Sequence, residues 1–152
     1  IHDNGTINIS SSSNNNTNGS NQPKHLCNFN DFSSNSAWFS NNEQNASLLF
    51  DFKNRKVKLT HYSFHTPSSN NNDYPKSWIV EFSNDLNGWH NKDNRNNEAT
   101  MNQANVCRTF KCKTQSDEFY RYIRIKSTSQ CWANEYYFDI AGVEFYGCLK
   151  EK

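Results

Sequence analysis

The sequence predicts an all-β domain in which two sheets pack as a sandwich. Along most of the chain, short aromatic or β-branched segments alternate with polar breaks of Asn, Ser, Asp or Gly, a rhythm typical of strands joined by turns. The breaks are too long and polar for a ladder of minimal hairpins, which favours a sandwich. No stretch keeps apolar residues at helical spacing over three turns, so helices are not expected to build the core.

Length and composition set the size of that core. The chain has 152 residues, which fits one domain. Only 34% of the residues are hydrophobic and the mean hydropathy is -1.02, so the core must come from short segments. Aromatic residues make up 14% of the chain, and each buries about 150 to 250 Å² of surface. That content excludes a chain that is disordered throughout.

The amino-terminal part predicts an edge strand, a loop and a helical turn, in that order. In Thr6–Ile9 the two Ile side chains fall on one face of a strand. Ser10–Asn21 is almost entirely Ser, Asn, Thr and Gly, residues that favour turns and cannot build a core. Pro23–Leu26 follows and suits one helical turn.

The later segments that are rich in aromatic and β-branched residues are predicted strands, because most alternate apolar and polar residues with period two. They are Ser47–Phe52, Val57–His65, Trp78–Phe82, Val106–Cys112, Phe119–Lys126 and Tyr136–Gly147. In Val57–His65 the apolar residues change face midway, which indicates either a bulge or a strand buried on both sides. The intervening segments Asn54–Lys56, Ser68–Asp73, Asn84–Asn97 and Ser127–Asn134 are predicted loops.

Charge and hydropathy argue against two classes of partner. Sixteen Lys and Arg against 15 Asp and Glu leave a net charge of +1, which gives no field to steer the chain toward nucleic acid or an anionic membrane. Apolar runs such as Leu48–Phe50 are far shorter than the roughly 20 residues that span a bilayer. We therefore expect no nucleic-acid partner and do not expect membrane binding.

Because the chain begins at Ile1 without a signal-peptide pattern, we expect a fragment or a processed start.

Cysteine usage favours the cell interior. The five cysteines are an odd number with no close CxxC pair, and they are Cys27, Cys107, Cys112, Cys131 and Cys148. This fits reduced thiols better than a disulfide framework. Sequons at Asn4, Asn8, Asn15, Asn18 and Asn45 are the counter-argument, but chance matches are expected in so Asn- and Ser-rich a chain.

No residue pattern predicts catalysis or a metal centre. The chain has no nucleophile motif, no phosphate-binding glycine loop and no paired carboxylates in a defined setting, so we expect no enzyme and no catalytic residue. His61 and His65 on one strand would lie about 13 Å apart, too far to share a metal ion. Asn28–Asp31 offers oxygen atoms that can bind calcium, although a network of turns explains these residues equally well. We predict no cofactor, with calcium as the alternative.

Aromatic residues that interrupt polar segments are the best candidates for binding. They are Trp38, Phe39, Tyr74 and Trp132. Aromatic side chains at the loops of a sandwich can stack on sugars or become buried against another protein. The alternative is that each ring folds back and seals the end of the sandwich.

Three motifs in order resemble those of discoidin domains, the coagulation-factor type C modules. The first is Trp78-Ile79-Val80-Glu81, followed by Ser83-Asn84-Asp85 and Trp89. Phe119–Ile125 resembles the Arg-Tyr-Ile-Arg strand of that family, and Ile140–Gly147 resembles its closing strand. The resemblance implies an eight-stranded antiparallel jelly-roll sandwich of the galactose-binding-like type over residues 6–149. Residues 1–5 would then be the remnant of a linker and residues 150–152 a tail.

The closest likeness is to the branch of this family in intracellular proteins of amoebae and protists that also carry a BTB domain, where stretches such as His2–Gly5 and Pro75–Trp78 recur. Members of the family bind ligands and do not catalyse. The resemblance places ligands at loops on one end of the sandwich, here Asn28–Ser40, Thr66–Lys76 and Ser127–Asn134.

Other family features match this chain only in part. Cys27 and Cys148 correspond loosely to the disulfide of extracellular members. His65 and Arg124 are the nearest counterparts of the His and Arg that hold fucose in lectin relatives, and Arg124 can equally face solvent on its strand.

We predict a non-catalytic recognition module that binds a protein partner and belongs to a larger intracellular protein or assembly, cytoplasmic or cytoskeletal. The ring anchors would be Trp38, Phe39, Tyr74 and Trp132, with polar contacts from Asn28, Asp31 and His65. The first alternative is a carbohydrate-binding lectin, secreted or at the cell surface. The second is a structural component of a cytoskeletal or filament complex.

Overall fold

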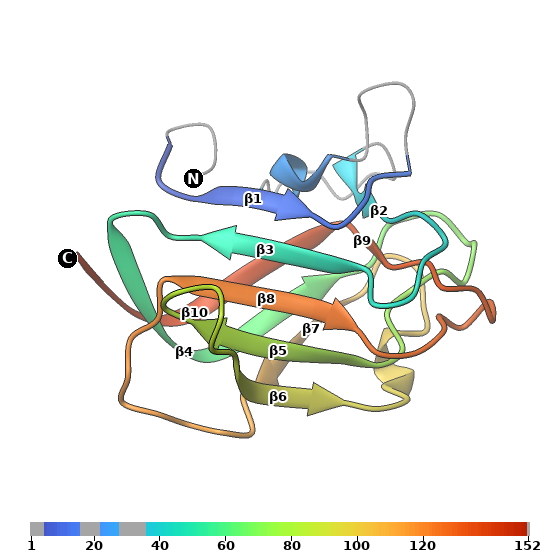
Figure 1. Ribbon diagram of the computed structural model, residues 1–152. Helices are drawn as coiled ribbons and strands as arrows, with labels where there is room; N and C mark the ends of the chain where they lie inside the picture. Colours follow the sequence, from blue (N-terminus) through green and yellow to red (C-terminus); the bar gives the residue numbers. More distant parts are fainter. Residues whose placement is uncertain (1–4, 16–21, 28–35, 152) are drawn as a thin grey trace.

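Two antiparallel sheets pack face to face in the computed structural model, which describes residues 5–15, 22–27 and 36–151 (Figure 1). One sheet has five strands in the order β1-β3-β8-β5-β6, and the other has three in the order β10-β4-β7. A short two-stranded sheet, β2-β9, lies at one end. The prediction of an all-β jelly-roll sandwich is confirmed, and its eight strands are those of the two larger sheets.

The strands and 3-10 turns occupy short segments of the chain. The strands are β1 Asn8–Ser11, β2 Trp38–Phe39, β3 Ser47–Asp51, β4 Arg55–His65, β5 Trp78–Ser83, β6 His90–Arg95, β7 Cys107–Lys111, β8 Tyr122–Ser127, β9 Asp139–Ile140 and β10 Gly142–Glu151. The 3-10 turns are η1 Pro23–Cys27 and η3 Ala99–Met101. The predicted edge strand is β1, which pairs with β3 and buries Ile7 and Ile9.

The change of face in β4 is a β-bulge, so one of the two alternatives left by the sequence is confirmed. On the neighbouring strand β10, Tyr146 pairs with His61 and Gly147 pairs with Leu59, which leaves Thr60 without a partner residue. The Thr60 hydroxyl donates a hydrogen bond to the Tyr146 carbonyl (3.1 Å). A side chain at Gly147 would place its Cβ 2.1 Å from the Lys58 carbonyl oxygen, so the close approach of the strands requires glycine there.

The core lies between the inner faces of the two large sheets. Leu48, Phe50, Ile123 and Ile125 are fully buried on β3 and β8. Aromatic rings from both sheets fill the core beside them: the ring centroid of Trp78 on β5 lies 5.2 Å from that of Phe64 on β4 and 5.3 Å from that of Phe110 on β7. The predicted concentration of aromatic residues therefore builds the core.

Strand β6 contradicts the prediction that Asn84–Asn97 is a loop. Its sequence, HNKDNR, has no apolar residue, so the period-two pattern of a strand could not identify it. On the neighbouring strand β5, Val80 pairs with Asp93 and Glu81 pairs with Asn91, which leaves Lys92 as the extra residue of a bulge. Because of the bulge, Lys92 and Asp93 both turn inward and are 6% and 1% exposed.

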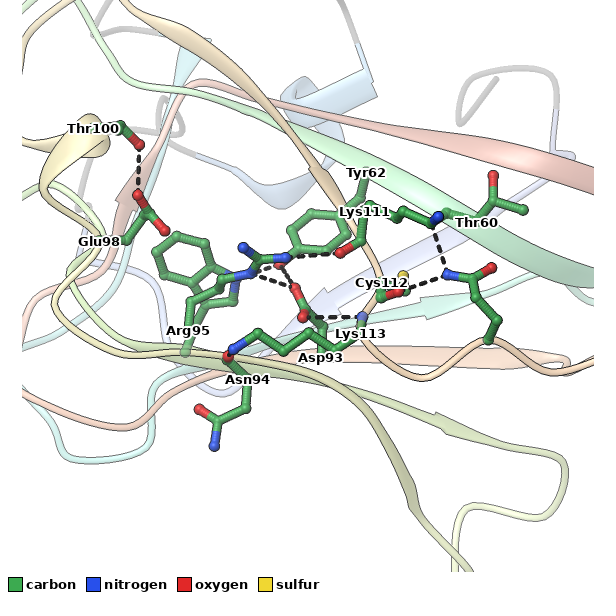
Figure 2. Close-up of polar contacts among 12 residues, drawn as sticks. Thr60, Tyr62, Asp93, Asn94, Arg95, Glu98, Thr100, Lys111, Cys112 and Lys113 are labelled. Atoms are coloured by element: carbon green, nitrogen blue, oxygen red, sulfur yellow. Dashed lines mark hydrogen bonds and ion pairs between the residues drawn. The ribbon is translucent and has the colours of Figure 1, made fainter.

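The buried carboxylate of Asp93 joins the two sheets (Figure 2). It accepts hydrogen bonds from the Tyr62 hydroxyl on β4 (2.5 Å) and from Nε of Arg95 (2.8 Å). The Tyr62 oxygen in turn accepts a hydrogen bond from Nε1 of Trp78 (2.8 Å), and Arg95 Nη2 donates to the Lys111 carbonyl on β7 (2.7 Å). Burial, together with the hydrogen bond to Asp93, raises the pKa of Tyr62, so this phenol stays protonated and donates.

Tyr62→Phe is expected to lower the free energy of unfolding by about 2 to 4 kcal/mol, because it leaves the indole N–H of Trp78 and the carboxylate of Asp93 each short of a partner inside the core. The measurement is urea denaturation. The matched control is Tyr146→Phe, since Tyr146 is 40% exposed and its hydroxyl donates to Glu144 at the surface. A control variant as unstable as Tyr62→Phe would show that the buried network has no special role.

Candidate functional site

Several long connections gather at the end of the sandwich that also carries β2 and β9, the right-hand end in Figure 1. They are residues 40–46, 66–77 and 128–138. The opposite end carries the turn between β3 and β4 and the end of β10. We call the first group the loop end, and it includes two of the three segments predicted to bind ligand.

Hydrogen bonds tie the second and third connections of the loop end together. The Ala133 amide donates to the Asn72 carbonyl (2.9 Å), and Nε1 of Trp132 donates to the Pro75 carbonyl (3.3 Å). Lys76 Nζ lies 5.0 Å from the centre of the Trp132 ring. Trp132 is therefore held in place while remaining half-buried, as a preformed binding surface requires.

A second pair of aromatic rings lies at the same end. Phe39 on β2 stacks on Tyr137, which precedes β9, with ring centroids 4.7 Å apart and an interplanar angle of 24°. Both residues are half-buried. Trp132, Phe39 and Tyr137 thus offer aromatic surface to solvent at the loop end.

Two of the predicted aromatic anchors are instead part of the core, so their assignment to the ligand is corrected. Trp38 is 0% exposed and Tyr74 is 1% exposed. Nε1 of Trp38 donates to the Ser13 carbonyl (3.0 Å), and the Tyr74 hydroxyl donates to the Ser69 carbonyl. These rings seal the end of the sandwich, because each has one polar atom that the nearby backbone satisfies.

The structure places His65 inside the fold rather than on a binding surface. His65 is 7% exposed, and its Nδ1 lies 2.7 Å from the Thr66 carbonyl oxygen, so it carries the proton and donates. Burial lowers the pKa of His65, an effect that the hydrogen bond to Thr66 partly offsets. The ring is thus neutral at pH 7 and fixes the end of β4.

Arg124 lies away from the loop end, in the middle of β8. Its guanidinium group lies 3.9 Å from the ring centre of Trp89 and contacts Glu81 at 2.7 Å. These contacts occupy Arg124 on the outer side of the five-stranded sheet. This position agrees with the alternative that Arg124 lies on the outer face of its strand.

The remaining predicted residues, Asn28 and Asp31, lie outside the described residues, as does the calcium alternative that rests on them. Within residues 5–15, 22–27 and 36–151, no three His, Cys, Asp or Glu side chains are placed to hold a metal ion. In the same ranges, no helix has the length and apolar character needed to cross a membrane.

A buried acidic residue, Asp139, forms a hydrogen bond with one connection of the loop end. Its Oδ2 accepts a hydrogen bond from Nδ2 of Asn71 (3.2 Å), while its Oδ1 is buried without a hydrogen-bond partner among the described residues. Burial raises the pKa of Asp139 to about 7; the Asn71 hydrogen bond opposes this shift and the charge of nearby Asp73 adds to it. Burial also raises the pKa of Asp73, whose Oδ1 lies 3.6 Å from Sγ of Cys131.

Tyr136 and Tyr137 are half-buried aromatics that the sequence did not identify as binding candidates. They fall in the predicted strand Tyr136–Gly147, because aromatic residues are typical of strands. In the structure that segment is divided into β9 and β10, and the two tyrosines precede both. The acidic Glu135 before them was the available signal that a loop continues to this point.

The fold is a jelly-roll β-sandwich of the galactose-binding-like type, with long loops gathered at one end. The family comparison agrees, because residues 8–141 match the F5/8 type C domain. This chain belongs to that family, the discoidin domains, and the predicted resemblance is confirmed at this level. A search of curated proteins found no match.

Solved structures with the same fold include carbohydrate-binding modules and a lectin. CpGH89CBM32-5 from Clostridium perfringens, in complex with GalNAc-β-1,3-galactose, has a TM-score of 0.71 at 12% identity, covering 94% of this chain and 96% of its own. The CBM32 of Clostridium perfringens NanJ, in complex with galactose, has a TM-score of 0.69 at 13% identity and covers 95% and 94%. The serum fucolectin of striped bass, Morone saxatilis, has a TM-score of 0.74 at 11% identity and covers 93% and 47%.

These neighbours overturn our prediction that the ligand is a protein partner. The named ligands of the first two are sugars, and the third is a lectin. The alternative of the sequence analysis, carbohydrate binding, agrees better with them.

The raised pKa of Asp139 predicts a stability that depends on pH. Between about pH 4 and pH 7 the folded state holds a proton that the unfolded state has released, so stability should fall as the pH rises through this range. The shift from 3.8 to about 7 corresponds to a loss of about 4 kcal/mol. Asp139→Asn should flatten this part of the profile. Thermal melts of both proteins from pH 4 to 8 test it, and parallel profiles would exclude the titration of Asp139 as the cause.

Proposed function

We propose that this chain is a non-catalytic carbohydrate-binding domain whose ligand docks at the loop end. The observation that carries the proposal is the half-buried aromatic surface of Trp132, Phe39 and Tyr137, at an end of the sandwich whose loops carry exposed asparagines. A sugar presents an apolar C–H face, which stacks on an aromatic ring, and hydroxyl groups, which exchange hydrogen bonds with carboxamides.

The connections of the loop end carry exposed asparagines. Asn70, Asn71, Asn72 and Asn134 are exposed, and the last two adopt left-handed conformations with φ of 60° and 63°. Such turns hold loops in one shape without regular strand pairing. The loop end therefore combines fixed rings with neutral hydrogen-bonding groups.

The structural neighbours and the family support the same function. Besides the modules described above, the lectin domain of lectinolysin was solved with Lewis B antigen, with a TM-score of 0.68. Domains of this family and these neighbours act as binding modules, which supports a role without catalysis.

Trp132→Ala should weaken sugar binding about 5- to 30-fold, which corresponds to about 1 to 2 kcal/mol for a stacked ring at the centre of a site. The measurement is a glycan array with bacterially produced protein, followed by calorimetry on the best glycan. Trp89→Ala is the matched control, because Trp89 is also half-buried but contacts Arg124 away from the loop end. Equal losses in the two variants, or an array with no bound glycan, would contradict the proposal.

We also propose that the domain works in a reducing compartment, as in the intracellular branch with BTB domains that it resembles. The thiols of Cys107 and Cys148 support this, since both are exposed and exposed thiols are oxidised outside the cell.

Mass spectrometry should find five alkylated cysteines when cells are lysed in iodoacetamide and the protein is then denatured without reductant. In the folded protein, Cys112 should react slowly, because burial raises the pKa of its thiol to about 12 and only the thiolate is nucleophilic. Cys148 serves as the exposed reference. A disulfide in the trapped protein would place the domain in an oxidising compartment.

A further inference from the structure

A cavity of about 320 Å³, which the sequence did not predict, lies within the loop end between residues 44–45 and residues 128–136. It is lined by Gln44, Asn45, Thr128, Ser129, Gln130 and Tyr136. We propose that this amide pocket binds one neutral sugar residue and rejects sugars that carry a carboxylate. The inference rests on the proposed function, and it identifies both a cavity and a class of sugar.

The lining of the amide pocket matches a neutral polyhydroxyl ligand. It contains three carboxamides, two aliphatic hydroxyls and one phenol ring, with no charged side chain. Each carboxamide has both donors and an acceptor, as each sugar hydroxyl does. The volume is at the lower end of the roughly 300 to 1,000 Å³ of small-molecule sites, which suits one monosaccharide unit.

Hydrogen bonds fix both walls of the pocket. The Tyr136 amide donates to Oδ1 of Asn42 (2.8 Å), and the Glu43 amide donates to the Tyr136 carbonyl (3.3 Å), so the backbone that carries the ring is held on both sides. On the other wall, Nε2 of Gln130 donates to the Asn134 carbonyl (2.9 Å). This bond leaves Oε1 of Gln130 as an acceptor with a fixed direction.

Further hydrogen bonds fix the backbone around Ser129, at one side of the pocket. The Ser127 hydroxyl donates to the Ser129 carbonyl (3.0 Å), and the Ser129 hydroxyl donates to the Gln130 carbonyl (2.9 Å). The Ser127 amide donates to the Ala46 carbonyl (2.9 Å), which anchors the segment carrying Gln44 and Asn45. A preformed pocket loses less conformational entropy on binding than a mobile one.

Charge around the pocket explains the preference for neutral sugars. Glu135 and Glu43 flank Tyr136 and its partner loop: Oε2 of Glu135 accepts a hydrogen bond from Asn42 (2.7 Å), and Oε1 of Glu43 accepts one from Ser12 (2.6 Å). A uronic or sialic acid would bring its carboxylate toward these two carboxylates with no cation in the lining to offset the repulsion.

Titration of ¹⁵N-labelled protein with D-galactose, N-acetylgalactosamine, D-glucose and D-galacturonic acid tests the pocket by NMR. Bacterial production leaves the sequon residue Asn45 without a glycan. We expect the side-chain amide signals of Gln44, Asn45 and Gln130 to shift with at least one neutral sugar. We expect galacturonic acid to bind at least about fivefold more weakly than galactose.

Variants separate the pocket from the rest of the loop end. Tyr136→Ala and Gln130→Ala should each weaken the neutral sugar at least about fivefold, and Tyr136→Phe should retain more binding than Tyr136→Ala because it keeps the ring. Tyr146→Ala, on the three-stranded sheet, is the control and should bind normally.

The outcomes distinguish this inference from the proposed function. Shifts of the Trp132 indole signal with unshifted pocket amides would overturn the amide pocket while leaving carbohydrate binding at the loop end intact. A domain that binds none of the sugars here and no glycan on the array would overturn both. Equal affinity for galactose and galacturonic acid would overturn the neutral selectivity.

Discussion

The structure depends on one buried carboxylate, Asp93, which joins the two sheets through Tyr62 and Arg95 (Figure 2). A buried charge is costly unless hydrogen bonds satisfy it. Here a phenol, a guanidinium group and the Lys113 amide (3.3 Å) do so. Only one relative position of β4, β6 and β7 brings these groups together. The network therefore fixes how the sheets are stacked, which apolar contacts alone specify less sharply.

The shape of the loop end depends on how the two sheets are stacked. Once the positions of β4, β5 and β8 are fixed, their connections meet at one end, and two aromatic side chains there, Trp38 and Tyr74, are fully buried. The chain thus uses some rings to close the sandwich and leaves others, such as Trp132, partly open to solvent. Each of these rings donates its N–H or O–H to a backbone carbonyl, because a buried ring with an unpaired donor would destabilise the fold. The position of that carbonyl determines whether the ring is buried or half-buried.

Much of the fold could be predicted from the sequence, because the period of the apolar residues and the aromatic content identify strands such as β5 and β8. The bulge at Thr60 was one of two alternatives that the change of face in β4 left open. Strand β6 could not, since its stability comes from backbone pairing and from Asp93 rather than from apolar residues. The site was less predictable for a related reason. Trp38 and Trp132 both interrupt polar segments, and their opposite exposure depends on partners distant in the chain, Ser13 and Pro75. Sequence identifies candidate rings, but tertiary contacts decide which of them face a ligand.

The way this end is built also explains why a small polar ligand suits it better than a protein. Stable protein interfaces bury about 800 Å² on each partner around a desolvated apolar centre. At the loop end, Trp38 and Tyr74, the rings that could supply such a centre, are 0% and 1% exposed. The other rings there, Phe39, Trp132, Tyr136 and Tyr137, are half-buried, and the loops of this end carry exposed asparagines. Neutral carboxamides are inexpensive to desolvate compared with charges, and they pair with hydroxyls without requiring a large contact area. A surface with scattered rings and many amides therefore binds best a ligand that has both an apolar face and hydroxyl groups.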